Sequence, residues 1–239
     1  MSVSTRHIDY ADGDAPLEGL LAWDDALPGP RPGVLVAHTW AGRGRFEEET
    51  AAGLTRLGYA GFALDLYGKG VRGETLEEKK ALMRPFMDDR ALLQRRMAAA
   101  LEALRRQAEV DPGRTAAIGF CFGGLCVLDL ARSGADVGAV ASFHGMFTPP
   151  ANAAGGRISA KVLALHGWDD PMAPPEALLG LARELSARGA DWQIHAYGNT
   201  MHAFTNPEAN EPGFGTVYQA DSARRAWQAM RNFLAETLS

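Results

Sequence analysis

The stretch Ile118-Gly119-Phe120-Cys121-Phe122-Gly123-Gly124-Leu125 decides the fold of this chain. It follows a short apolar run at residues 114–118 and leads into apolar residues with helical spacing. A small residue two places before and two places after a central nucleophile is the sequence form of the strand-turn-helix nucleophile elbow. The glycines suit such a turn, because neighbouring side chains must be small if the reactive atom is to stand clear of the sheet. We therefore expect a strand before Cys121 and a helix after it.

Two interpretations of Cys121 fit this stretch. At the start of a helix, the positive end of the helix dipole would stabilise a thiolate, which favours a nucleophile. Free cysteine is also among the most buried residue types, and glycine-rich turns are common wherever a strand and a helix pack closely. The motif alone leaves both a catalytic and a structural cysteine open.

Apolar runs and helical patterns alternate along the remainder of the chain. Two runs separated by Asp12-Gly13 predict an N-terminal hairpin with a type I′ turn. A helix that begins after Thr75 is expected to stop where Pro85 interrupts it. Buried strands are expected at residues 34–37, 60–65, 114–118, 137–143, 161–165 and 192–197, and further helices at 46–57, 87–107, 125–134, 178–188 and 215–238. This alternation predicts an α/β fold with a mostly parallel central sheet, an antiparallel N-terminal edge hairpin and helices on both faces.

Length and composition indicate an ordinary globular protein. The chain has 239 residues, of which 46% are hydrophobic and 22% charged, so we expect a single domain over residues 1–239. The net charge of −5 gives no electrostatic basis for binding nucleic acid or an anionic membrane, which favours a small-molecule substrate. No apolar run has the length of a membrane span or the form of a signal peptide, so we expect a cytoplasmic protein.

The two cysteines, Cys121 and Cys126, are expected to be reduced thiols. They lack C-x-x-C spacing, and no two histidines have the short helical spacing of a metal-binding pair. The sequence therefore predicts no metal site.

Three residues with reactive side chains follow predicted strands in a characteristic order along the chain: Cys121, then Asp169 or Asp170, then His202. Nucleophile, acid, histidine is the chain order of the α/β-hydrolase fold. In such a set the histidine takes the thiol proton, and the carboxylate holds the imidazole in the correct tautomer. This shared order favours the catalytic interpretation of the cysteine.

Other residues are expected to assist. The backbone N–H groups of Phe122 and Trp40 are candidates for stabilising an oxyanion. His38, His144 and His166 all follow or end apolar runs and are expected to support loops through hydrogen bonds, whereas His195 lies inside a strand and is expected to be structural.

The sequence resembles the dienelactone hydrolase family, single-domain α/β-hydrolases with a Cys-His-Asp triad. The matching segments lie at residues 34–42, 65–67, 119–124, 142–145, 166–171 and 202–204. The resemblance implies that Cys121, Asp170 and His202 form the triad and that Trp40 and Phe122 supply the oxyanion N–H groups. It also implies cofactor-independent hydrolysis of a small ester or lactone through an acyl-enzyme.

Two positions depart from the family pattern. Well-known members have a glutamate that helps to ionise the thiol, where this chain has Thr39. They also place an arginine four residues beyond the catalytic histidine to bind a substrate carboxylate, where this chain has Asn206. Arg72 or Arg84 could supply a second arginine. Thr39, Arg72, Arg84 and Asn206 are therefore the substrate-binding candidates, and the departures argue against dienelactone itself as the substrate.

Two alternative functions remain open. The same triad supports thioester hydrolysis or acyl transfer. A non-catalytic small-molecule binder or thiol sensor could also keep the fold, because a fold does not prove an activity. Whichever function applies, we expect the protein to be a monomer or a small homo-oligomer.

Overall fold

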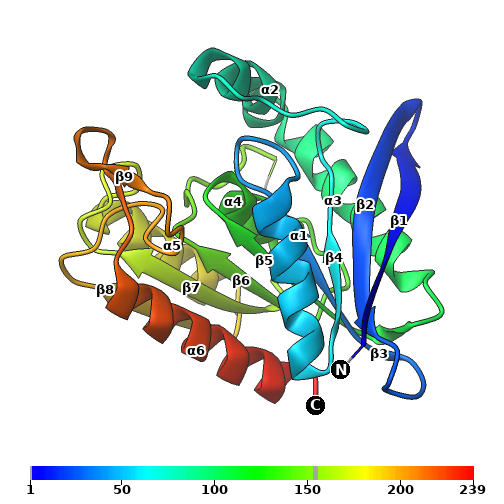
Figure 1. Cartoon of the computed structure of the whole chain (residues 1–239). Helices are drawn as coiled ribbons and strands as arrows, with labels where there is room; N and C mark the ends of the chain where they lie inside the picture. Colours follow the sequence, from blue (N-terminus) through cyan, green and yellow to red (C-terminus); the bar gives the residue numbers. More distant parts are fainter. Residues whose placement is uncertain (1, 153–155) are drawn as a thin grey trace.

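A mixed eight-stranded sheet forms the centre of the computed structural model, which describes residues 2–152 and 156–239 (Figure 1). Its strand order is β1-β2-β4-β3-β5-β6-β7-β8, with β3 to β8 parallel and β1 and β2 antiparallel. The strands are β1 Val3–Asp12, β2 Ala15–Asp24, β3 Arg31–Ala37, β4 Ala60–Ala63, β5 Val110–Phe120, β6 Ala139–Phe143, β7 Lys161–Gly167 and β8 Trp192–Tyr197. The predicted α/β class, the mostly parallel sheet and the antiparallel edge hairpin are confirmed.

The turn of the edge hairpin differs from the prediction. Asp12 pairs with Ala15, so the two loop residues are Gly13 and Asp14, one place later than expected. Gly13 has φ 58°, whereas Asp14 is not among the residues with positive φ. A type I′ turn needs positive φ at both central residues, so the predicted type is wrong. Glycine at the first central position is instead typical of type II′.

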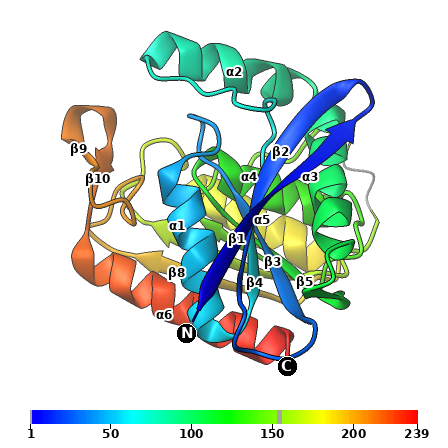
Figure 2. The ribbon, with the colours of Figure 1, turned by 45° about the vertical axis from the view of Figure 1, so that its right-hand side comes forward.

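Helices cover both faces of the sheet (Figures 1 and 2). One face packs against α1 (Arg45–Leu54) and α6 (Ala220–Thr237), and the other against α3 (Arg90–Arg105), α4 (Phe122–Arg132) and α5 (Pro175–Ala187). Strand side chains alternate between these two cores, so Val34 and Val36 join one while Leu35 and Ala37 join the other. Strands buried on both faces account for the continuous apolar runs in the sequence. None of the helices in the described residues is both long and apolar enough to cross a membrane.

Helix α2 (Leu76–Asp88) continues through Pro85, so the prediction that proline ends it is wrong. The helix begins as expected at Thr75, whose side chain accepts a hydrogen bond from the Glu78 N–H at 3.2 Å. Proline removes one N–H from the ladder, but the N–H of Asp89 donates to the Pro85 carbonyl at 2.9 Å. That bond closes the last turn, and α3 begins immediately afterwards.

The sequence pattern also misses a small hairpin before α6. Strands β9 (Asn210–Glu211) and β10 (Thr216–Val217) pair antiparallel around a short 3₁₀ helix, η2 (Pro212–Phe214). A second 3₁₀ helix, η1 (Thr55–Leu57), extends α1. Gly215 has φ 79° and belongs to the hairpin, so α6 starts at Ala220 rather than at residue 215. Strands of two residues carry too little alternation to be recognised in a sequence.

A buried ion-pair network holds α4 against its neighbours. Asp129 is 0% exposed and accepts hydrogen bonds from Arg90 Nε at 2.6 Å and Arg132 Nη1 at 3.1 Å. We expect Asp129→Ala to lower the free energy of unfolding by about 3–5 kcal/mol, because the largely buried Arg90 guanidinium loses its carboxylate and Arg132 keeps only its pairing with Glu184. Urea denaturation measures the loss. Asp136→Ala removes an exposed carboxylate and should cost less than about 1 kcal/mol; equal losses for the two variants would contradict this prediction.

Candidate active site

The turn from β5 into α4 places Cys121 in a strained elbow. Cys121 has φ 56° and ψ −116°, a conformation that few residues other than glycine adopt. Gly119 and Gly123 are required by close packing, since a Cβ on Gly119 would collide with the Gly123 carbonyl and one on Gly123 with the Ala37 carbonyl. The Cys121 side chain is partly exposed, whereas the rest of α4 is buried. These are the features that the sequence motif predicts for an elbow.

Asp170, rather than its neighbour Asp169, lies beside His202. The imidazole Nδ1 is 2.7 Å from Asp170 Oδ2, and the two residues are 1% and 2% exposed. Asp169 turns away and accepts a hydrogen bond from the Thr200 N–H at 3.1 Å. The other oxygen of Asp170 accepts from the Met172 N–H at 2.8 Å, which holds the carboxylate in place. An acceptor at Nδ1 fixes the proton there and leaves Nε2 for other chemistry.

His202 and Cys121 are coupled electrostatically. Burial lowers the pKa of His202, but the negative charges of a Cys121 thiolate and of Asp170, together with the hydrogen bond to Asp170, raise it to about 10. Its Nε2 atom is buried and makes no hydrogen bond to the described residues. With a pKa near 10, His202 is held in its protonated form at neutral pH by the negative charges around it.

The loop after β3 contains a backbone N–H that has no acceptor in the described part of the chain, at the position expected for an oxyanion donor. The Thr39 N–H donates to Glu47 Oε1 at 3.2 Å, and the Gly42 N–H to the Thr39 carbonyl at 3.3 Å. Among the described residues, the Trp40 N–H donates to no acceptor. The Phe122 N–H, in the first turn of α4, also has no partner there, as the helix geometry dictates. These two N–H groups are the ones that the sequence analysis predicts as donors to an oxyanion.

Two buried histidines support the site loops, as expected. His144 Nδ1 accepts a hydrogen bond from the Cys121 N–H at 3.1 Å, and its Nε2 lies 2.8 Å from Thr205 Oγ1. His166 Nε2 lies 2.8 Å from the Ala173 carbonyl, across the loop that carries the acid. Burial lowers the pKa of both imidazoles, so both stay neutral near pH 7. His144 thus connects the elbow to the chain segment that follows His202.

The substrate-binding candidates lie in different surroundings. Arg72 is exposed and lies against the loop after β3, where a side chain on Gly44 would collide with its guanidinium. Thr39 Oγ1 faces the Ala41 N–H at 3.5 Å. Arg84 is 81% exposed on α2, 4.0 Å from Asp88.

Asn206, the fourth candidate, has its own local partners. Its amide oxygen accepts a hydrogen bond from the Glu208 N–H at 3.0 Å, and its backbone N–H donates to the Ala203 carbonyl at 2.9 Å. Asn206 therefore shapes a turn after His202. A role in substrate binding stays a prediction for all four residues.

Two supporting residues are missed by sequence reasoning. Glu47, 3% exposed in α1, accepts from the backbone N–H groups of both Thr39 and Gly44. Burial raises its pKa, against those hydrogen bonds and the charge of Arg72. The Tyr67 hydroxyl donates to the Trp40 carbonyl at 3.1 Å. A glutamate three residues after a helix N-cap is a sequence signal that could have identified Glu47, but no sequence signal points to Tyr67.

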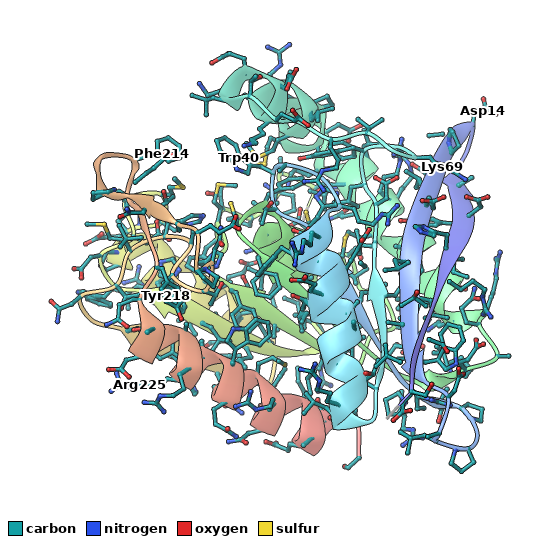
Figure 3. All side chains as sticks on the ribbon, viewed as in Figure 1. Asp14, Trp40, Lys69, Phe214, Tyr218 and Arg225 are labelled. Atoms are coloured by element: carbon teal, nitrogen blue, oxygen red, sulfur yellow. The ribbon has the colours of Figure 1, made fainter. Side chains whose placement is uncertain are left out.

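An aromatic pair borders the loop after β3. Trp40 and Phe214, the latter in the short 3₁₀ helix between β9 and β10, stack with ring centroids 6.1 Å apart and an interplanar angle of 17° (Figure 3). Phe214 is 43% exposed. The described residues contain no group of three or more histidine, cysteine, aspartate or glutamate side chains placed to hold a metal ion.

Comparison with known proteins identifies the family. A model described as the dienelactone hydrolase family matches residues 17–238. The chain belongs to the dienelactone hydrolase family. The resemblance seen in the sequence motifs is thereby confirmed, and membership makes the protein an α/β-type hydrolase.

Several known proteins are similar to this dienelactone hydrolase family member. The crystal structure of the dienelactone hydrolase-like promiscuous phosphotriesterase P91, from metagenomic libraries, is 38% identical with a TM-score of 0.94, and all of both chains is covered. A putative carboxymethylenebutenolidase of Yersinia pestis is 26% identical, over 98% of this chain and 91% of that protein. An uncharacterised protein of Caenorhabditis elegans is 36% identical, over 64% of this chain and 98% of that protein.

Proposed function

We propose that this family member hydrolyses small esters or lactones without a cofactor, with Cys121 as nucleophile, His202 as base and Asp170 orienting the base. The observation that carries the proposal is the 2.7 Å hydrogen bond from His202 to Asp170, made by an imidazole that also responds to the charge of Cys121. The strained elbow at Cys121 and the carboxymethylenebutenolidase name of a relative support it.

The reaction follows in two halves. The Cys121 thiolate attacks the carbonyl carbon, and the tetrahedral intermediate collapses as the bond to the leaving oxygen breaks and His202 gives that oxygen its proton. His202 then takes a proton from water, whose hydroxide attacks the thioester and releases the acid together with the thiolate. The imidazolium keeps the proton taken from water, so the thiolate–imidazolium pair, and with it the enzyme, is restored. For a lactone, the leaving hydroxyl stays within the product.

The N–H groups of Trp40 and Phe122 would stabilise the oxyanion in both halves. Each has no acceptor within the described protein, and a donor already directed at the developing charge needs no reorganisation during the reaction. Loss of one such donor costs about 10²–10³ in kcat in well-studied hydrolases.

The surroundings favour a neutral substrate with an apolar part. Asn206 stands where family members carry a carboxylate-binding arginine, and its amide oxygen is already bonded to Glu208. The stacked rings of Trp40 and Phe214 offer an apolar surface beside the loop after β3. Arg72 and Arg84 remain the candidates for contact with an anionic group.

Alkylation tests the thiolate directly. Because the pKa of His202 is raised to about 10, an imidazolium stabilises the thiolate through the neutral range, and we expect iodoacetamide to alkylate Cys121 rapidly at pH 6. An ordinary thiol, with a midpoint near 8.5, is less than about 1% ionised there. Mass spectrometry of peptides after timed labelling measures the rate.

The protein carries its own control for this labelling. Cys126 is 0% exposed, and burial raises its pKa, so it should stay unlabelled in the folded protein. His202→Asn should slow the reaction of Cys121 about 100-fold at pH 6 and much less at pH 9, where free thiols ionise. Slow, pH-dependent labelling of Cys121 in the unmodified protein would count against the proposal and favour a binder or a structural cysteine.

A second activity is supported by one relative. P91, 38% identical over the full chain, is described as a promiscuous phosphotriesterase, so we also propose slower hydrolysis of neutral aryl phosphotriesters. Cys121 would displace the aryloxide at phosphorus in place of the alkoxide at carbon. Matched 4-nitrophenyl esters, thioesters, lactones and phosphotriesters would rank the activities by kcat/KM. Preference for thioesters would favour the alternative of thioester hydrolysis or acyl transfer on the same triad.

A further inference from the structure

His38, at the end of β3, makes two hydrogen bonds that determine its tautomer. Its ring is 0% exposed. The backbone N–H of Leu66 donates to Nε2 at 3.2 Å, so Nε2 must carry a lone pair. The proton of the neutral ring therefore sits on Nδ1, which donates to the Thr39 carbonyl at 2.6 Å.

The Thr39 carbonyl belongs to the same peptide unit as the Trp40 N–H. In a trans peptide the C=O and N–H bonds point in opposite directions within one plane. A donor that holds the carbonyl on one side consequently directs the N–H to the other. We propose that His38 is a positioning residue, which sets the plane of the Thr39–Trp40 peptide and thereby aims the Trp40 N–H at the oxyanion.

Neighbouring contacts hold both ends of this arrangement. The Tyr67 hydroxyl fixes the next carbonyl, that of Trp40, at 3.1 Å. On the other side of the ring, the turn that presents the Leu66 N–H is closed by Asp65, whose Oδ1 accepts from the Tyr67 N–H at 2.9 Å. The Tyr67 ring also packs edge-on against His38, with centroids 4.7 Å apart. His38 thus links a braced turn to the peptide that carries the free N–H.

A neutral ring is essential, because an imidazolium could not accept the Leu66 N–H. Burial lowers the pKa of His38, against the hydrogen bond to Thr39 and the charge of Asp65, to about 4. The ring therefore keeps both hydrogen bonds at neutral pH.

Two substitutions at His38 distinguish the contributions of the hydrogen bonds made by Nδ1 and by Nε2. The amide N–H of His38→Asn can replace Nδ1–H and donate to the Thr39 carbonyl. The longer side chain of His38→Gln reaches the Leu66 N–H but leaves the Thr39 carbonyl with only the longer hydrogen bond from the Gly42 N–H, at 3.3 Å. We expect His38→Gln to lower kcat for a 4-nitrophenyl ester about 10- to 100-fold with little change in KM, because the effect is on an oxyanion donor. His38→Asn should keep at least tenfold more kcat than His38→Gln, and His195→Gln, in β8, is the matched control.

The readout that distinguishes positioning from general damage is alkylation. Iodoacetamide reacts at the Cys121 sulfur by displacing iodide, with no charge developing on a carbonyl oxygen. The rate of alkylation of His38→Gln should therefore stay within about twofold of the unmodified protein while kcat falls. Equal losses of both rates, an unchanged kcat, or equal kcat values for the two variants would overturn the inference.

A measurement on the unmodified protein keeps the inference testable even if a variant does not fold. Long-range ¹⁵N–¹H NMR spectra at pH 7 should show His38 protonated at Nδ1 alone; protonation at Nε2 would overturn it. The inference rests on the proposed function, and the two fail differently. If ester hydrolysis does not depend on Cys121, the proposed function fails whatever tautomer His38 has.

Discussion

Replacing Cys121 by alanine is expected to lower the rate of ester hydrolysis by about 10⁴-fold or more, since nucleophile, base and acid act as a unit. The proposed reaction forms a thioester at this sulfur, which lies in the strained turn between β5 and α4. Stopped-flow kinetics of the unmodified protein with a 4-nitrophenyl ester should show a burst of one equivalent when deacylation is slow. Intact-mass spectrometry should find one acyl group, on the peptide that contains Cys121.

The matched control is Cys126→Ala, five positions further along α4. Cys126 is fully buried in the core and plays no part in the proposed chemistry, so this variant should keep its activity even if it is somewhat less stable. Full activity of Cys121→Ala, or an acyl group found on another residue, would remove the basis of the proposed mechanism.

Asp170→Asn is expected to lower kcat by about 10⁴-fold, the effect seen when the acid of such a triad becomes an amide. An amide can present a donor to Nδ1, so the imidazole is held in the wrong tautomer and Nε2 no longer accepts a proton. Asp169→Asn is the control, because it keeps an oxygen for the Thr200 N–H, whereas the hydrogen bond to His202 is made by Asp170. A larger loss of kcat for Asp169→Asn than for Asp170→Asn would mean that Asp169, and not Asp170, is the acid of the triad.

Asp170→Asn is also expected to change how the free energy of unfolding depends on pH. Asp170 is one of the groups that raise the pKa of His202 to about 10, above its usual value near 6.5. A raised folded-state pKa stabilises the protein fully below about 6.5, and this contribution is lost as the pH rises through 10. The unmodified protein should therefore exceed Asp170→Asn in free energy of unfolding most clearly near pH 6, and the difference should shrink towards pH 10. Urea denaturation at several pH values measures it.

The ends of the helices were predicted less accurately from the sequence than the presence of the helices and strands. Helix α2 runs through Pro85, and the β9–β10 hairpin replaces the expected start of α6. In both places local propensity competes with hydrogen bonds that residues elsewhere complete, such as the N–H of Asp89 returning to Pro85. The longer strands and helices were predicted correctly because a buried face leaves a clear period in the sequence.

The sequence by itself determined the elbow, the order of Cys121 and His202 along the chain, and the α/β architecture. Each depends on local sterics or on periodicity: Gly119 and Gly123 have no room for a side chain, and alternating cores impose alternating apolar residues. The family resemblance already pointed to Asp170, but local pattern does not separate it from Asp169, because both follow the same strand. Only the tertiary structure shows that Asp170 lies beside an imidazole 32 residues further along the chain. It also determined the His38 tautomer, since that depends on a backbone N–H 28 residues away, which no local pattern encodes.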